Sequence, residues 1–190
     1  AYFIEAADWL REHDPSRLVT YTGGVEGDGD GDKMDALCPV EIRDKLDIIS
    51  FNSYCGIHDG ATPGRPDEFH INYDKVRLVS SWGKPVIHAE VGIDAVKGET
   101  GYDFGEDRQA GYHAKVVQYV AETRDEGSLQ GVCLFVLNDF RTPIKLSRHQ
   151  GGYNRKGLLT DTLEPKKAYN VVKEGFNRLA ADPPSALCLN

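Results

Sequence analysis

The stretch KPVIHAEVGID, residues 84–94, decides the fold prediction. Its apolar run at 85–89 is typical of a strand in a sheet that is covered on both faces. An ionisable residue, Glu90, follows this run at once. A carboxylate at the end of such a strand must be hydrogen-bonded or take part in chemistry, because an unpaired buried charge costs free energy. The stretch therefore predicts a buried strand with a functional carboxylate at its carboxyl end.

Working outward, three further segments read as strands. They are residues 18–22, 47–54 and 131–137. Helical patterns precede, separate or follow the strands, over residues 2–10, 41–45, 67–82, 107–125 and 166–179. Strands that alternate with helices indicate a parallel sheet with helical crossovers. The sequence therefore predicts an α/β fold.

Polar residues come directly after the apolar part of three of these strands. They are Asn52 and Tyr54 after the second, Glu90 after the third, and Asp139 and Arg141 after the fourth. In parallel α/β folds, ligands bind at the carboxyl ends of the strands. We therefore expect a binding or catalytic site there.

Composition excludes several classes of function. The chain has 190 residues and a net charge of −8, which argues against the basic face that nucleic acids require. No run of 18 apolar residues occurs, so no membrane span is expected. The four cysteines are widely spaced and form no C-x-x-C pair, so neither a zinc site nor a dense disulfide framework is predicted.

The acidic loop GDGDGDKMD, residues 27–35, resembles the start of a calcium-binding loop. Asp28, Asp30 and Asp32 have the right spacing, but Lys33 replaces the required glycine and Pro39 stands where the bidentate glutamate belongs. A solvated loop is the better interpretation. No metal and no cofactor is expected, and a metal-dependent hydrolase is disfavoured because no His/Asp spacing builds a ligand set.

Five blocks resemble glycoside hydrolase family 2, the family of β-galactosidases, β-glucuronidases and β-mannosidases. In order they are DPSRLVTYTG (14–23), DIISFNSY (47–54), KPVIHAEVGID (84–94), LNDFRT (137–142) and YNRKGLLTDTLEPKKA (153–168). The resemblance implies that residues 1–181 are the second half, strands 5 to 8, of a (β/α)8 TIM-barrel catalytic domain. Residues 182–190 are expected to be a mobile tail.

The resemblance also implies a reaction. Glu90 would be the nucleophile of a retaining exo-β-glycosidase and form a glycosyl-enzyme, and Tyr54 would orient it. The acid/base is expected in an Asn-Glu pair upstream of Ala1, so the N-terminal half of the same enzyme would be a partner and this chain alone would be inactive. Two departures from the family pattern are Phe135, where tryptophan is usual, and Ala89, where serine or threonine is common.

The substrate implied by the resemblance is a carbohydrate. Asn154 and Lys156 resemble the Asn-x-Lys pair with which β-glucuronidases hold the uronate carboxylate, and Asn52, Asp139 and Arg141 are further substrate-binding candidates. A β-glucuronidase is favoured. A β-galactosidase of the same family, which carries a similar run, and a non-catalytic carbohydrate-binding barrel fragment stay open, as do the cellular compartment and a homo-oligomeric state.

Overall fold

The computed structural model describes residues 2–24, 38–54, 70–101 and 103–182. The acidic loop with Asp28, Asp30 and Asp32 and all but the first residue of the expected 182–190 tail lie outside these ranges. The elements in chain order are α1 (Tyr2–His13), β1 (Thr20–Gly24), α3 (Val40–Arg43), β2 (Ile48–Asn52), α4 (His70–Ser80), β3 (Val86–Val91), α5 (Glu106–Asp125), β4 (Gly131–Leu134), β5 (Phe140–Arg141), β6 (Tyr153–Asn154) and α6 (Lys167–Ala181).

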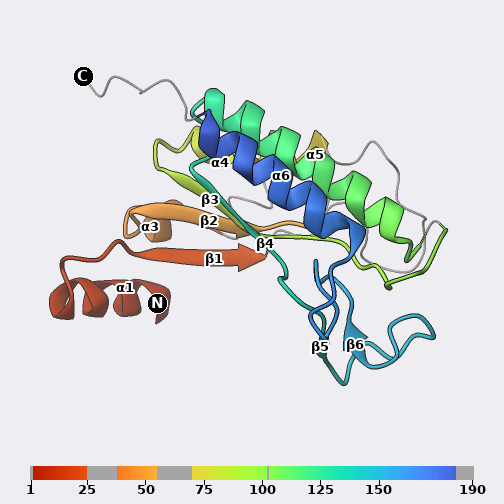
Figure 1. Cartoon of the computed structure of the whole chain (residues 1–190). Helices are drawn as coiled ribbons and strands as arrows, with labels where there is room; N and C mark the ends of the chain where they lie inside the picture. The colour runs from red at the N-terminus through yellow and green to blue at the C-terminus, as the bar shows by residue number, and fades with distance from the viewer. Residues whose placement is uncertain (1, 25–37, 55–69, 102, 183–190) are drawn as a thin grey trace.

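The main sheet has four parallel strands in the order β1-β2-β3-β4, so each strand lies beside its successor in sequence. Helices α4, α5 and α6 lie over one side of this sheet (Figure 1). The loop that carries the antiparallel pair β5-β6 lies beyond the end to which the arrow of β1 points. The predicted α/β fold with a parallel sheet is confirmed, although among the described residues the sheet is open, with β1 and β4 as its edges.

The four predicted strands are present, but the last one is shorter than the apolar run 131–137. It ends at Leu134 because the following backbone turns to a different partner. The Val136 amide donates to the carbonyl of Lys156 at 3.4 Å, and the Leu159 amide donates to the carbonyl of Leu137 at 2.9 Å. The carboxyl end of β4 is therefore tied to the loop after β6, which brings that loop to the strand ends.

Strand β3 follows from local sequence and is buried on one face only. Gly83, at a φ of +76°, ends the turn after α4 in the left-handed region that glycine adopts without strain. Val86 and His88 are fully buried against the helices, whereas Ile87 on the other face is half-buried. Cys133 of β4 is exposed. Among the described residues, the second face of β3 is therefore only half-buried.

Helices α5 and α6 form a close pair on the outside of the sheet. A β-carbon at Gly175 of α6 would come within 2.5 Å of a Val117 methyl of α5, so the absence of a side chain allows the approach. Leu158, Ala168 and Val172 form a small core beneath this pair. Since Leu158 belongs to the loop after β6, the helices also fix that loop.

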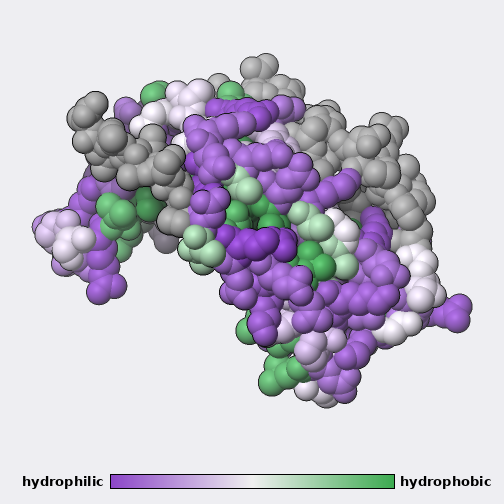
Figure 2. Space-filling view, turned by 45° about the horizontal axis from the view of Figure 1, so that its top comes forward, coloured by the Kyte–Doolittle hydropathy of each residue, from purple (hydrophilic) through white to green (hydrophobic). Residues whose placement is uncertain are grey.

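The surface carries apolar side chains in separate groups among hydrophilic ones (Figure 2). The large exposed ones lie in α1 and shortly after it (Tyr2, Phe3, Trp9, Leu10, Leu18), at the start of α3 (Val40), and between the end of β4 and the start of α6 (Leu137, Phe140, Ile144, Leu146, Leu163). None of the helices within the described ranges has the length and apolar character that a membrane span needs.

Candidate functional site

The candidate nucleophile lies where β2 and β3 end. Glu90 is the penultimate residue of β3, and the register of the sheet places it beside Asn52, the last residue of β2. Tyr54 follows two residues later, and its hydroxyl donates a hydrogen bond to Oε2 of Glu90. The sequence predicted Tyr54 and Glu90 as a pair, and the structure brings them into direct contact.

The environment of Tyr54 keeps its hydroxyl protonated, so that it can always donate a hydrogen bond. Burial raises the pKa of the Tyr54 phenol, and the hydrogen bond to Glu90 and the charges of Glu90 and Asp94 raise it further. The phenol therefore keeps its proton at any ordinary pH and always donates to the carboxylate. A donor held on one oxygen of a carboxylate fixes its orientation.

Lys156 lies over the Tyr54 ring. Its Nζ is 5.3 Å from the ring centroid and 2.9 Å from Oδ2 of Asp94. A second lysine, Lys145, approaches the same Asp94 oxygen at 3.5 Å. The side chain of Asn154 accepts a hydrogen bond from the Lys156 backbone amide at 3.1 Å, so it shapes the turn that delivers this lysine. Glu90, Tyr54 and Lys156 thus form one contiguous cluster.

Asp94 is the counter-ion of this cluster. Burial by itself would raise the pKa of the Asp94 carboxyl, but Lys156, Lys145 and the Arg155 backbone amide outweigh burial and lower the pKa. Burial also lowers the pKa of the Lys156 ammonium, against the attraction of Asp94. Asp94 is therefore ionised near neutral pH and holds Lys156 in place.

Asp139 belongs to a second, adjacent cluster. Its Oδ1 accepts from Lys166 Nζ at 2.7 Å and from the Gly157 amide at 2.9 Å, and its Oδ2 is 3.3 Å from the Arg155 guanidinium. Burial is the largest cause of the pKa shifts of Asp139 and Lys166. It raises the pKa of the Asp139 carboxyl and lowers the pKa of the Lys166 ammonium. Both carboxylate oxygens of Asp139, a candidate substrate-binding residue, thus accept hydrogen bonds from protein donors. These bonds connect the segment after β4 to the loops that follow it.

The last two predicted residues have different surroundings. Arg141 is exposed, and its guanidinium lies over the Tyr153 ring, 5.3 Å from the centroid, with Nε donating to the Tyr153 hydroxyl at 3.2 Å. The side-chain oxygen of Asn52 has no hydrogen-bond partner within the described part of the chain. Asn52 therefore offers a free acceptor beside Glu90, while Arg141 stands at the outer rim.

Phe135 occupies the place where the family pattern has tryptophan. Its ring meets the Tyr54 ring edge to face at a centroid distance of 6.2 Å, and it meets Phe140 in the same way at 6.1 Å. The three rings form an apolar wall that leads from the Glu90–Tyr54 pair toward the exposed Phe140. Such a wall suits the apolar face of a sugar ring or of a group attached to it.

Sequence reasoning missed four charged residues of these clusters: Asp94, Lys145, Arg155 and Lys166. Asp94 could have been found, because it follows Glu90 by four residues at the same strand end. The others lie in loops and at a helix start, and nothing in their local sequence separates them from solvated charges.

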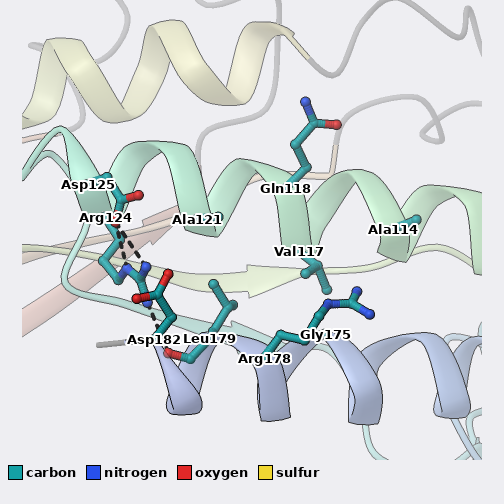
Figure 3. Close-up of a pocket in the computed structure, with 10 residues that line it drawn as sticks. All are labelled: Ala114, Val117, Gln118, Ala121, Arg124, Asp125, Gly175, Arg178, Leu179 and Asp182. Atoms are coloured by element: carbon teal, nitrogen blue, oxygen red, sulfur yellow. Dashed lines mark hydrogen bonds and ion pairs between the residues drawn. The ribbon is translucent and has the colours of Figure 1, made fainter. Parts of the chain in front are cut away.

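The described residues contain no group of three or more His, Cys, Asp and Glu side chains that is placed to hold a metal. A pocket of about 390 Å³ lies between α5 and α6, with Ala121 and Gly175 among its lining residues (Figure 3). Arg124 on its rim already pairs with Asp125 at 2.9 Å and donates to the Leu179 carbonyl at 3.1 Å. This pocket contains none of the predicted site residues.

The fold and the two clusters define an α/β protein with a polar site at the carboxyl edge of a parallel sheet. No protein-family model matches the chain. Among curated proteins, it is similar to β-glucuronidases from Rattus norvegicus (28% identity, covering 94% of this chain and 26% of the relative) and Paenibacillus borealis (23%, covering 96% and 28%). The chain thus spans about a quarter of the length of these relatives.

Solved structures agree with this similarity. The chain resembles a Bifidobacterium dentium β-glucuronidase complexed with coumarin-3-O-glucuronide, with a TM-score of 0.73 and 25% identity over 97% of this chain and 27% of that one. It shares its fold with a GH2 β-galacturonidase from Eisenbergiella tayi, with a TM-score of 0.72 and 20% identity over 92% and 29%. The similarity to β-glucuronidases and to a GH2 β-galacturonidase therefore extends over most of this chain. The parallel-sheet α/β structure of the chain is similar to that of GH2 β-glucuronidases.

Proposed function

We propose that this chain is part of a retaining exo-β-glycosidase in which Glu90 is the nucleophile. Residues 1–181 would be strands 5 to 8 of its TIM barrel, since four parallel strands in sequential order are what half of such a barrel contains. The observation that carries the proposal is the Tyr54–Glu90 contact at the carboxyl ends of β2 and β3. Similarity to glycosidases over nearly the whole chain supports it.

The mechanism follows from that geometry. The Glu90 carboxylate, held by the Tyr54 hydroxyl, attacks the anomeric carbon, and the glycosidic bond to the leaving oxygen breaks. A second carboxyl group, about 5–5.5 Å away in retaining enzymes, gives that oxygen its proton. The same group later takes a proton from the water that releases the sugar. We assign this acid/base to the N-terminal half of the same enzyme, the partner of this chain.

For the substrate, we propose a terminal β-linked glucuronic acid. Lys156, which lies over the ring of the tyrosine that binds Glu90, would face the uronate carboxylate, and Asn154 shapes the turn that carries it. Asn52 would bind a sugar hydroxyl, Arg141 would act at the rim, and Asp139 would contribute through its ion pairs. One observation favours the alternative, a β-galactosidase: Asp94 already neutralises Lys156.

The experiment that tests the nucleophile uses the full-length protein. Glu90→Gln keeps the size and the Tyr54 contact but removes the attacking charge, so kcat for aryl β-glycosides should fall by about a thousandfold or more. Glu99→Gln, a change at an exposed glutamate in the loop after β3, should leave kcat unchanged. Proton NMR should show the β-anomer of the sugar as the first product. A Glu90→Gln protein that folds and retains turnover would refute the assignment.

A further inference from the structure

We propose that Lys145 is a second cation of the sugar site and that, together with Lys156, it selects a uronic acid over a neutral sugar. The inference rests on the proposed glycosidase function and deepens it. Lys156 and Lys145 share one counter-ion, Asp94, at 2.9 Å and 3.5 Å. The loop lysine thereby becomes a specificity-determining residue that the motif comparison does not include.

The charges show why a second cation is needed. Asp94 and Lys156 are each 3% exposed and neutralise one another, so the pair by itself carries no net charge toward a ligand. With Lys145, the group formed by Asp94 and the two lysines has two cationic side chains against one carboxylate. A cationic side chain without a carboxylate of its own, in a partly desolvated place, attracts a substrate carboxylate and gains nothing from a neutral hydroxymethyl group.

The distances show which lysine is available. The Lys156–Asp94 contact of 2.9 Å is a charge-assisted hydrogen bond, whereas the 3.5 Å between Lys145 Nζ and Asp94 is too long for a strong one. The Lys145 side chain is 21% exposed, so a ligand can reach it. Lys145 therefore has donor capacity left for a substrate carboxylate, while Lys156 stays anchored.

Backbone hydrogen bonds hold the loop that carries Lys145. It lies in the loop between β5 and β6, and its carbonyl accepts a hydrogen bond from the Gly152 amide at 2.8 Å. The Gly152 carbonyl in turn accepts from the Thr142 amide at 2.9 Å. Because these bonds already order the backbone of the loop, its ordering adds no further cost when a ligand binds, which favours binding.

The geometry also fits one sugar ring. Glu90 marks the position of the anomeric carbon, and the contacts run from Glu90 through the Tyr54 hydroxyl and ring to Lys156 and Asp94. In a pyranose the substituent on C5 lies across the ring oxygen from C1. A uronate carboxylate on C5 would therefore point toward the side of the site where the lysines are.

The test uses full-length protein and two aryl substrates that differ only at C6, 4-nitrophenyl β-D-glucuronide and 4-nitrophenyl β-D-glucoside. Lys145→Met should raise KM for the glucuronide at least tenfold with little change in kcat, and should leave the weaker glucoside reaction unchanged. Lys145→Arg should retain most of the glucuronide affinity. The control is Lys97→Met, which removes an outer lysine that pairs with Glu164 at 3.2 Å and should change neither reaction.

Calorimetric binding of sodium D-glucuronate separates this inference from the proposed function. If wild-type protein cleaves neither glycoside but binds glucuronate and loses that binding in Lys145→Met, the glycosidase proposal fails and the role of Lys145 stands. If the glucuronide is cleaved equally well by wild type and Lys145→Met, the role of Lys145 is overturned and the glycosidase proposal stands. If the wild type does not bind glucuronate, the proposed role of Lys145 is overturned as well.

Discussion

Replacing Lys166 by methionine should destabilise the protein far more than the same change at its neighbour Lys167. The Lys166 side chain is 0% exposed, and its ammonium donates to Asp139 at 2.7 Å, to the Ala95 carbonyl at 2.6 Å and to the Arg155 carbonyl at 3.0 Å. Methionine has a similar length and no charge. The change therefore removes the three bonds without opening a large cavity.

The expected magnitude follows from the partner that is left behind. Removing one member of a buried ion pair costs about 3–5 kcal/mol, because the other charge stays buried without compensation. Asp139 keeps the Gly157 amide and the Arg155 guanidinium, so the low end of that range applies, ~3 kcal/mol. With a urea m-value of roughly 1–3 kcal/mol/M, the unfolding midpoint should fall by about 1 M or more.

Urea unfolding followed by circular dichroism measures this shift. Lys167→Met is the matched control, because that side chain is 52% exposed and pairs with Asp107 on the surface, so its midpoint should not move. The double change Asp139→Asn with Lys166→Met should recover part of the loss, since the stranded charge is gone. Equal shifts for Lys166→Met and Lys167→Met would refute the reasoning.

Two further predictions concern the same unfolding assay. Gly92→Ala should lower the midpoint, because a β-carbon there would overlap the Phe135 carbonyl oxygen. Gly111→Ala, with open space around it in α5, should raise the free energy of unfolding by up to ~1 kcal/mol and so raise the midpoint. If both changes raise it, the close approach of β3 and β4 is refuted. Burial lowers the pKa of His113 to about 4 from 6.5, so the unfolded chain binds more protons between these values and stability falls as pH drops through that window, by up to ~3 kcal/mol. His113→Gln should show a smaller fall between pH 7 and pH 5 than wild type, and an unchanged fall would contradict the assignment.

The strands and their order were predictable because apolar runs and helical patterns alternate along the chain. The pairing of Tyr54 with Glu90 was predicted by the resemblance to glycoside hydrolase family 2, and the register of β2 and β3 places the two residues at the same edge of the sheet. The end of β4 was not predictable, since its pairing beyond Leu134 depends on a loop about twenty residues further along the chain. Nor was the half-covered face of β3, because local apolar character does not reveal whether a second layer is present.

By itself, the sequence determined the element types, the parallel sheet and the identity of the carboxylate at the end of β3. Only the tertiary structure decided which charges matter around it. Lys166 and Lys167 are adjacent and chemically identical, yet one is fully buried on Asp139 and the other is exposed beside Asp107. Likewise Lys145 joins Asp94 across about fifty residues of chain. Burial and the pairing of charges depend on contacts between segments far apart in sequence, and local sequence patterns do not predict those contacts.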